Sequence, residues 1–260
     1  METTRLIRIG VQLNPQHAPY AVLRDAVLRA EAAGVDIVFN WDHFWPLGGD
    51  RDGEHHECWT TLGAWAESTS RIELGPMVSA VGYRNPDLVA DMARTLDHVS
   101  GGRFVLGLGA GFRAAEYAEY GIPFGTPGER LDQLEEGLER ITRRLGLGHP
   151  APTRHIPVLL GGGGERRTLS VVARHADIWN TFAEGEDFAR KSRVLDEHCA
   201  HIGRDPGEIE RSVLVGGEPR EIGEPLVAMG ASLFVLGLNP PYDLDAVARW
   251  LAWRDAVNGG

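Results

Sequence analysis

Residues 156–180 read IPVLLGGGGERRTLSVVARHADIWN, and they show the sequence pattern that repeats along the chain. The apolar run 156–160 predicts a buried strand, and the four glycines after it predict a loop. Apolar residues at helical spacing over 165–176 predict a helix, after which DIWN begins another strand. A strand, a loop, a helix and a further strand in this order indicate a parallel α/β sheet.

The same alternation continues toward both ends of the chain. Strands are predicted at 6–13, 36–44, 71–81, 102–112, 156–164, 177–183, 209–217 and 231–238. Helices are predicted at 18–34, 57–69, 85–102, within 113–146, and at 165–176, 186–203, 218–230 and 243–257. The strands are apolar on both faces, as is typical of a parallel sheet covered by helices.

Eight strand–helix units in 260 residues predict a single domain, 1–260, folded as a closed (β/α)₈ barrel of the α/β class. The active site of such a barrel lies at the C-terminal ends of its strands. The alternative is an open doubly wound sheet, which usually carries a nucleotide fingerprint after its first strand. Here that turn reads LNPQHAPY (13–20), which favours the barrel.

Composition narrows the function classes. A formal net charge of −11 argues against a protein that binds duplex nucleic acid. No run of eighteen apolar residues is present, so no membrane partner is expected. Cys58 and Cys199 are too few for a disulfide framework, and the N-terminal sequence enters a strand pattern without a signal peptide. A cytoplasmic protein acting on a small-molecule substrate is therefore expected.

The second predicted strand ends in Asn40-Trp41-Asp42-His43-Phe44-Trp45. An Asp-His pair at a strand end can hold one imidazole tautomer and exchange a proton near neutral pH. The alternative is structural: Asp42 caps the following loop and His43 packs beneath it. Trp41 and Trp45 could line a substrate pocket or pack the loop down.

Glycines interrupt the third and fourth predicted strands. Gly75-Pro76 in the third indicates a bulge or the close approach of a ligand. Gly107, Gly109 and Gly111 in the fourth could leave room for a flat ring at the barrel mouth. Tight packing at the narrow waist of the barrel is the alternative for these three.

The loop of Gly161, Gly162, Gly163 and Gly164 precedes a predicted helix, so its unhindered N–H groups indicate a phosphate site. A basic pair in the first turn of a helix is electrostatically unusual, and it fits a phosphate nearby. The side chains expected to face that phosphate are Arg166, Arg167 and Thr168. Neither common nucleotide fingerprint matches, and a tight turn is the alternative.

Metal-capable side chains occur together in the loop 46–59, at His55, His56, Glu57 and Cys58. Adjacent ligands do not match the usual zinc spacings, so no metal site is expected. A solvated loop, or a lid over the substrate, accounts for this segment better.

The stretches 41–46 (WDHFWP), 74–111 and 157–180 together resemble the bacterial luciferase-like superfamily. Within it, the pattern is most similar to oxidoreductases that use the deazaflavin coenzyme F420, and enzymes that use flavin mononucleotide (FMN) share the scaffold. The resemblance covers nearly the whole chain and is strongest over 36–182. It implies a (β/α)₈ barrel with the cofactor ring at the C-terminal face.

The resemblance also implies roles for matching residues around the ring. A non-proline cis peptide supports the ring from behind, and Met77-Val78 occupies that place. Asp42 matches the residue that contacts the polar edge of the ring, and His43 matches the active-site histidine that donates or accepts a proton. The residues expected around the phosphate and the cleft are Gly161–Gly164, Thr168, Arg166 or Arg167, Trp179 and Asn180.

Two positions depart from the family pattern. Relatives that oxidise sugar phosphates carry a glutamate directly after the glycines of the fourth strand, where this chain has Phe112. Glu116 lies a helical turn further on and is not expected to reach the site. A tryptophan common after the Asp-His pair corresponds to Leu47. These differences argue against a sugar-phosphate substrate.

The function expected is an F420-dependent oxidoreductase that transfers hydride between the cofactor and a small organic substrate. His43 would move the accompanying proton, held in place by Asp42 or a neighbouring backbone group. The alternatives are an FMN-dependent monooxygenase and a barrel that binds cofactor without catalysis. A cofactor-free isomerase or aldolase is less favoured, because Lys191 is the only lysine. A homodimer through the apolar helix 243–257 is one expected arrangement, and packing of that helix on the barrel is the other.

Overall fold

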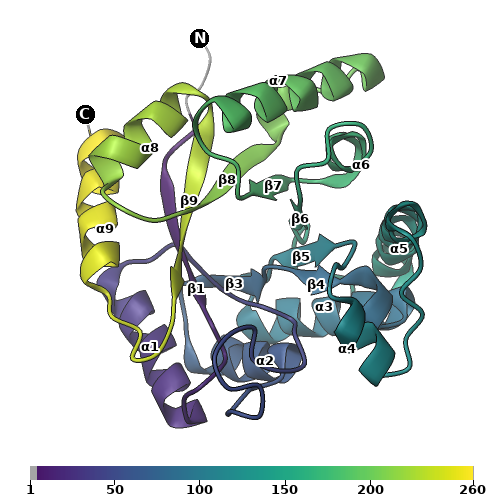
Figure 1. Ribbon diagram of the computed structural model, residues 1–260, viewed down its shortest axis with the longest axis horizontal. Coiled ribbons are helices and arrows are strands. Elements are labelled where there is room, and N and C mark those ends of the chain that lie inside the picture. Colours follow the sequence, from purple (N-terminus) through teal and green to yellow (C-terminus); the bar gives the residue numbers. More distant parts are fainter. Residues whose placement is uncertain (1–4, 260) are drawn as a thin grey trace.

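The computed structural model describes residues 5–259, and Figure 1 looks along a central ring of strands surrounded by helices. The strands are β1 (Arg8–Leu13), β2 (Ile37–Asn40), β3 (Glu73–Pro76), β4 (Ser79–Ala80), β5 (Leu106–Gly109), β6 (Val158–Gly161), β7 (Ile178–Thr181), β8 (Glu210–Val215) and β9 (Ala231–Leu238). The α-helices are α1 (Tyr20–Ala33), α2 (Cys58–Ser68), α3 (Pro86–Ser100), α4 (Ala114–Glu119), α5 (Pro127–Leu147), α6 (Thr168–His175), α7 (Gly185–Ile202), α8 (Pro219–Ala228) and α9 (Asp245–Asn258).

All the strand pairs are parallel, and the order in the sheet is β3-β2-β1-β9-β8-β7-β6-β5-β4. Between the two ends of this order, the N–H of Val105 donates to the carbonyl of Leu74 over 2.9 Å. That contact brings β3 beside the segment leading into β5. The predicted α/β barrel is therefore confirmed.

The count of eight strands needs one correction, because the third barrel strand is divided into β3 and β4. The division falls at Met77-Val78, and the peptide bond between these residues is cis, as expected from the resemblance. On either side of this break the backbones of neighbouring strands lie very close together. A Cβ atom on Gly75 would lie 2.1 Å from the carbonyl oxygen of Val105, and one on Gly107 would lie 1.8 Å from that of Pro76. Glycine is required at both positions.

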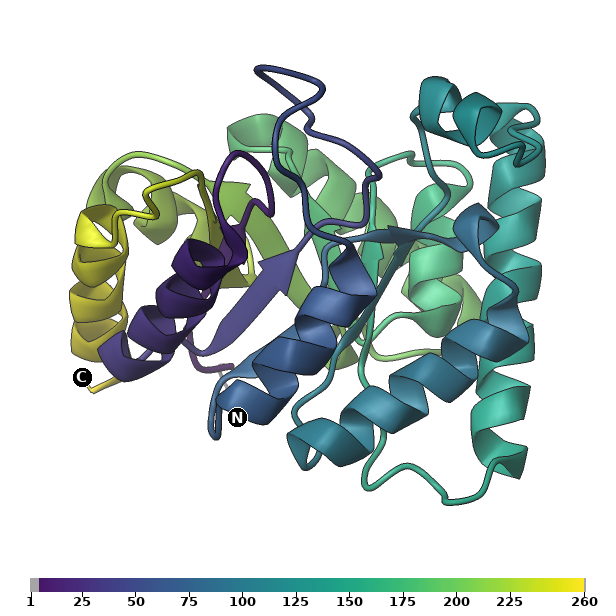
Figure 2. The same ribbon diagram turned by 90° about the horizontal axis from the view of Figure 1, so that it is seen from below.

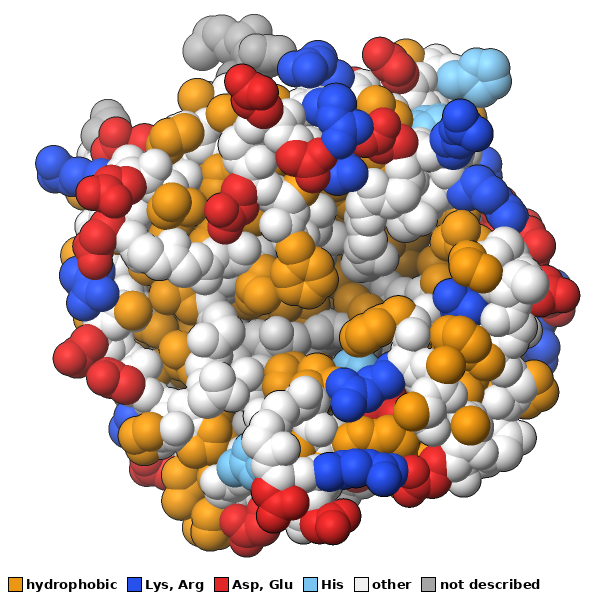
Figure 3. Space-filling model, viewed as in Figure 1, with side chains coloured by type: hydrophobic (Ala, Val, Ile, Leu, Met, Phe, Trp, Pro, Cys, Tyr) orange, Lys and Arg blue, Asp and Glu red, His pale blue; other side chains and the backbone are white. Residues whose placement is uncertain are grey.

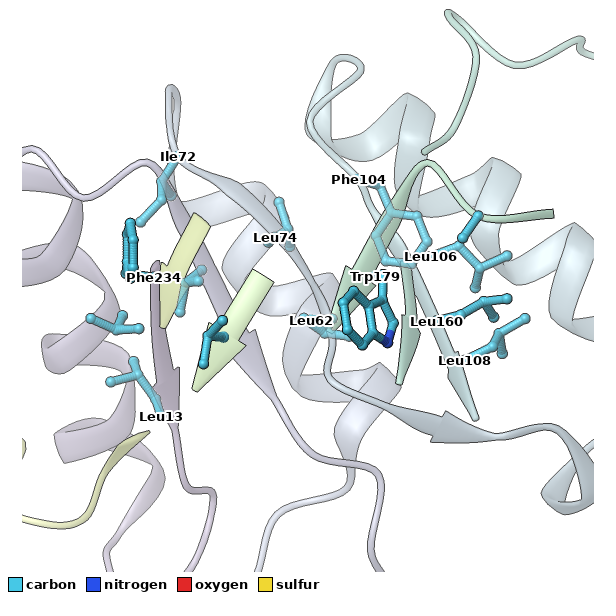
Figure 4. Packing of buried hydrophobic residues seen from close by; sticks show 14 of the residues in the cluster. Leu13, Leu62, Ile72, Leu74, Phe104, Leu106, Leu108, Leu160, Trp179 and Phe234 are labelled. Carbon is cyan, nitrogen blue, oxygen red and sulfur yellow. The ribbon is translucent and has the colours of Figure 1, made fainter. Parts of the chain in front are cut away.

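Alternate residues along a strand face opposite sides of the sheet, and in β6 and β7 the two sides belong to different apolar layers. Leu159 and Ile178 are register partners that belong to the small cluster inside the barrel. The next pair, Leu160 and Trp179, belongs to the larger cluster between the strands and the helices. Figure 4 shows this outer layer, with Trp179 lying near Leu106, Leu108 and Leu160. Burial on both faces explains why the strands read as continuous apolar runs.

Several helix ends follow the sequence signals. Gly34 and Gly101 adopt left-handed backbone after α1 and α3, and the Asn85 side chain accepts from the N–H of Asp87 in front of Pro86. The helix predicted over 165–176 begins later, at Thr168, because residues 165–167 form turns after the glycine loop. In the side view of Figure 2, the loop between β2 and α2 rises above the strand ends.

Charged side chains cross-link the N-terminal ends of the strands. Arg8 of β1 pairs with Glu73 of β3 and, over 3.0 Å, with Glu210 of β8. Burial raises the pKa of Glu210, an effect that the nearby Arg8 opposes. The site described below lies at the opposite, C-terminal ends. Within residues 5–259, no helix combines the length and the apolar character needed to cross a membrane.

Candidate functional site

A cavity of about 680 Å³ lies at the C-terminal ends of the strands. The face drawn in Figure 3 is hollowed at its centre, where hydrophobic side chains gather. Many residues singled out from the sequence line this cavity: Trp41, Asp42, His43, Met77, Val78, Gly109, Gly111, Phe112, Gly161, Gly162, Thr168 and Asn180. Loops after β2, β5 and β6 thus meet around one space, as the barrel prediction required.

His43, in the loop after β2, is held by a carboxylate from α4. Its Nδ1 lies 2.8 Å from Oε2 of Glu116, and Oε1 of Glu116 accepts from the backbone N–H of Phe44 over 3.3 Å. An ionised carboxylate only accepts hydrogen bonds, so the proton of a neutral His43 ring resides on Nδ1. The lone pair is then left on Nε2, which has no partner among residues 5–259. The expectation that Glu116 stays out of reach is therefore wrong.

The Glu116 carboxylate is fully buried, and it receives a second side-chain donor, the hydroxyl of Tyr83. Burial alone raises the pKa of a carboxyl group, but the hydrogen bonds from His43 and Tyr83 outweigh burial and lower the pKa of Glu116. Burial and the same carboxylate raise the pKa of Tyr83. Glu116 is therefore a fixed negative charge that orients His43.

The expectation that Asp42 holds His43 is wrong. The Asp42 carboxylate is buried and accepts hydrogen bonds from Arg84, from the hydroxyl of Ser79 and from the indole N–H of Trp59. Arg84 contributes both terminal nitrogens, and its Nη2 lies 3.1 Å from Oδ1. Asp42 therefore lines the cavity paired with Arg84, which also contacts Glu57, and it makes no hydrogen bond with the imidazole of His43.

The glycine loop curves around Thr168 at the start of α6. Gly162 has φ of 131°, which side chains rarely allow, and its N–H donates to the carbonyl of Asn180. A Cβ atom on Gly164 would lie 2.7 Å from Oγ1 of Thr168. Among residues 5–259, the N–H groups of Gly163 and Gly164 find no acceptor. These two donors lie beside the cavity, which is lined by Gly161 and Gly162.

The basic residues near this loop are directed elsewhere than predicted. Arg167 forms an ion pair with Asp132 of α5 and donates to the carbonyl of Gly128. Arg166 is exposed and is not part of the cavity lining. Lys191 of α7 instead approaches the loop, with Nζ 3.0 Å from the carbonyl oxygen of Gly163.

Several predicted site residues lie outside the cavity lining: Trp45, Gly107, Gly163, Gly164, Arg166, Arg167 and Trp179. For Gly107, the close approach to Pro76 supports the packing alternative. Trp179 is fully buried behind the glycine loop, where its indole N–H donates to the carbonyl of Gly162. Trp45 is nearly buried beneath the guanidinium group of Arg51.

Imidazole groups anchor the segment after β2 to other parts of the chain. Nε2 of His55 lies 2.8 Å from the carbonyl oxygen of His43, and Nε2 of His56 lies 2.9 Å from that of Ala18. Glu57 caps α2 by accepting from the N–H groups of its first turn. These contacts fix the end of the loop that leads from β2 into α2. A lid role for the loop stays a prediction.

Four polar residues that line the cavity were not found from the sequence: Gln12, Asn14, Tyr83 and Asn239. Asn14 is the least expected, because its side-chain oxygen is buried without a partner beside the cavity. Gln12 and Asn14 could have been identified as site residues from their position at the end of the first predicted strand. Glu116 carried no such signal, because its approach to His43 depends on the turn between β5 and α4.

A sequence profile described as luciferase-like monooxygenase matches residues 3–216. The chain belongs to the luciferase-like monooxygenase family. Among its relatives, an uncharacterized Mycobacterium tuberculosis protein is 33% identical, over 61% of each chain. A putative coenzyme F420-dependent oxidoreductase of M. tuberculosis is 30% identical, over 66% of this chain and 54% of the relative. The alignments therefore span just over half the length of these relatives.

Further matches include monooxygenases and an F420-dependent enzyme. The pyrimidine monooxygenase RutA of Methylorubrum extorquens is 27% identical, over 80% of this chain and 61% of its own length. A solved F420-dependent secondary alcohol dehydrogenase superposes with a TM-score of 0.81 at 17% identity, over 96% and 98% of the two chains. A long-chain alkane monooxygenase gives 0.70 at 16% identity, over 87% and 69%. At these identities the superpositions show the shared fold.

Proposed function

We propose that this protein is an F420-dependent oxidoreductase acting on a small organic substrate. The observation that carries the proposal is His43, which lines the cavity and is held by a buried carboxylate on one ring nitrogen, so that the other nitrogen is left free. Conversion of an alcohol to a carbonyl, or the reverse, requires a proton acceptor or donor at the oxygen atom. The F420-dependent relative among the matches supports this reading.

The residues of the cavity fit a flat cofactor that bears a phosphate group. Gly163 and Gly164 offer two unpaired N–H groups at the start of α6, where the helix dipole also favours an anion. Asn14 offers a buried oxygen without a donor, which suits an N–H group at the edge of a heterocyclic ring. Val78, after the cis peptide, lies against Gly109 and Gly161 and forms an apolar wall.

When bound, a deazaflavin supplies the hydride donor or acceptor for the reaction. The protein's own contribution is to position the substrate, to exclude water and to move one proton. In alcohol oxidation, Nε2 of His43 accepts the hydroxyl proton, and Glu116 stabilises the imidazolium that results. In carbonyl reduction, the protonated ring returns that proton from Nε2. Asp42, already neutralised by Arg84, serves to shape the site.

The His43→Ala variant tests this assignment. We expect it to bind the deazaflavin with nearly unchanged affinity and to lose about 10²- to 10⁴-fold in turnover. Turnover is measured with a panel of secondary alcohols and ketones, with and without oxygen. Full turnover in His43→Ala would contradict the proton-transfer role. A strict requirement for FMN and oxygen would favour the monooxygenase alternative, which the RutA match supports.

A further inference from the structure

The cavity lining is almost free of charge. Among the described residues 5–259 it contains no lysine or arginine side chain, and its one carboxylate is that of Asp42. Asp42 is already paired with Arg84. Away from the glycine loop, a phosphate or carboxylate group on a substrate would therefore enter this space without a counter-charge, and burying an unpaired ion is strongly unfavourable.

The arginines just outside the lining are held by other groups. The guanidinium of Arg113 lies 6.0 Å from the ring of Trp45, and its Nε is 3.9 Å from Oε1 of Glu116. Arg130 is nearly buried and donates from Nε to the carbonyl of Gly111 over 3.0 Å. Turning either side chain toward a substrate would break these contacts.

Two large aromatic side chains border the cavity and are unusually exposed. Phe112, after β5, is 71% exposed, and Phe182, after β7, is 76% exposed. Exposed aromatic rings beside a cavity favour an apolar group that covers them. The ring of Phe112 meets that of His43 edge to face, with 5.6 Å between centroids. The apolar surface therefore begins beside the group that handles the proton, and Leu131 and Leu134 of α5 extend it.

We propose that the substrate carries, beside its alcohol or carbonyl group, a substituent that is uncharged and apolar, and that Phe112 and Phe182 enclose this substituent. Both are then specificity-determining residues of the site. This inference rests on the proposed oxidoreductase function, because it names the substrate class of the same cavity. It separates the site from one that accepts phosphorylated sugars.

A matched pair of ketones tests the inference by binding rather than turnover. 2-Octanone and 7-oxooctanoate have the same number of carbon atoms, and the second ends in a carboxylate. Calorimetric titration into the protein, with a fixed excess of deazaflavin and again without it, should show 2-octanone binding at least about tenfold more tightly. Equal or tighter binding of 7-oxooctanoate, or no binding of 2-octanone, would overturn the inference.

Variants assign the preference to the two aromatic residues. Phe112→Ala and Phe182→Ala should each weaken 2-octanone binding about tenfold, the effect of losing most of one buried aromatic contact. Phe112→Arg should raise the affinity for 7-oxooctanoate above that of the unaltered protein. Leu147→Ala, which removes an equally exposed apolar side chain at the end of α5, should change neither affinity. Unchanged 2-octanone binding in both alanine variants would exclude these residues as determinants.

The binding measurements separate this inference from the function on which it rests. If 2-octanone binds with the expected preference but neither it nor 2-octanol is turned over with deazaflavin, the oxidoreductase proposal fails and the apolar specificity stands. If 2-octanol is oxidised but 7-oxooctanoate binds better than 2-octanone, the oxidoreductase proposal stands and the proposed apolar specificity fails.

Discussion

Oε2 of Glu116 lies 2.8 Å from Nδ1 of His43, although 73 residues separate the two in the sequence. The turn after β5 brings α4 over the loop that follows β2. Because the carboxylate is buried and accepts from Nδ1, it fixes which imidazole nitrogen carries the proton. The other nitrogen of this cavity-lining residue is then left as an acceptor, which is the state needed to take a proton from an alcohol.

Replacing the carboxylate by an amide should change this tautomer. In Glu116→Gln, Nδ1 of His43 can accept from the amide N–H₂ group, which favours the proton on Nε2. We expect the ¹⁵N NMR shifts of the His43 ring to show the Nδ1–H form in the unaltered protein and a substantial Nε2–H population in the variant. Turnover should fall at least about tenfold.

Tyr83→Phe is the matched control for that experiment, because it removes a neutral donor to the same carboxylate. It should leave the Nδ1–H form of His43 in place. If Glu116→Gln also keeps that form, the carboxylate does not set the tautomer, and the proposed role of Glu116 is wrong.

The stability contributed by Glu116 should depend on pH in a defined direction. Its pKa is lowered in the folded protein, so it contributes stability above the unfolded pKa of about 4.3. That contribution disappears as the pH falls through the folded pKa. The difference in free energy of unfolding between the unaltered protein and Glu116→Gln should therefore be larger near pH 7 than at about pH 4. Urea unfolding at both values measures it, and a constant difference would contradict the assignment.

The ion pair of Asp42 and Arg84 should behave as a buried pair. Arg84→Met leaves the Asp42 carboxylate without its cation and should lower the free energy of unfolding by about 3–5 kcal/mol. Adding Asp42→Asn should recover part of the loss. Arg144→Met, which breaks an exposed pair with Asp91, should cost less than about 1 kcal/mol. Strictly additive effects of the Arg84 and Asp42 substitutions would show that the pair is uncoupled.

The glycine loop should tolerate a methyl group poorly at Gly162. Its φ is 131°, and a Cβ atom there would lie 3.0 Å from the methyl group of Thr168. Gly162→Ala should therefore lower the free energy of unfolding by about 1–3 kcal/mol. Gly216→Ala is the control, because a Cβ there meets nothing within 4 Å. Thermal unfolding compares the two variants, and equal stability of both would mean that the loop backbone can rearrange.

The fold could be predicted because its signals are local and repeat along the chain. Apolar runs such as 156–160 and helix ends such as Gly34 and Gly101 carry enough information to place strands and helices in order. For the third strand, Gly75-Pro76 indicated a bulge and the resemblance placed a cis peptide at Met77-Val78, but the division into β3 and β4 was not predicted.

Most of the site residues that were predicted lie at or just after strand ends. His43, Asp42 and the glycines Gly161 and Gly162 were found in this way, and the structure places them around one cavity. The pairing of Asp42 with Arg84, and of His43 with Glu116, depends on how distant loops pack. A sequence neighbour such as Asp42 is the natural first choice of partner for His43, but side chains on adjacent residues need not face each other.

Parallel fluorescence titrations with the deazaflavin F420 and with FMN test the central claim most directly. Trp41 lines the cavity, so a bound ring should quench tryptophan emission, and Trp41→Phe identifies the part of the signal that arises there. We expect saturable quenching by the deazaflavin at concentrations at which FMN has little effect. Quenching by FMN with no response to the deazaflavin would contradict the proposed cofactor.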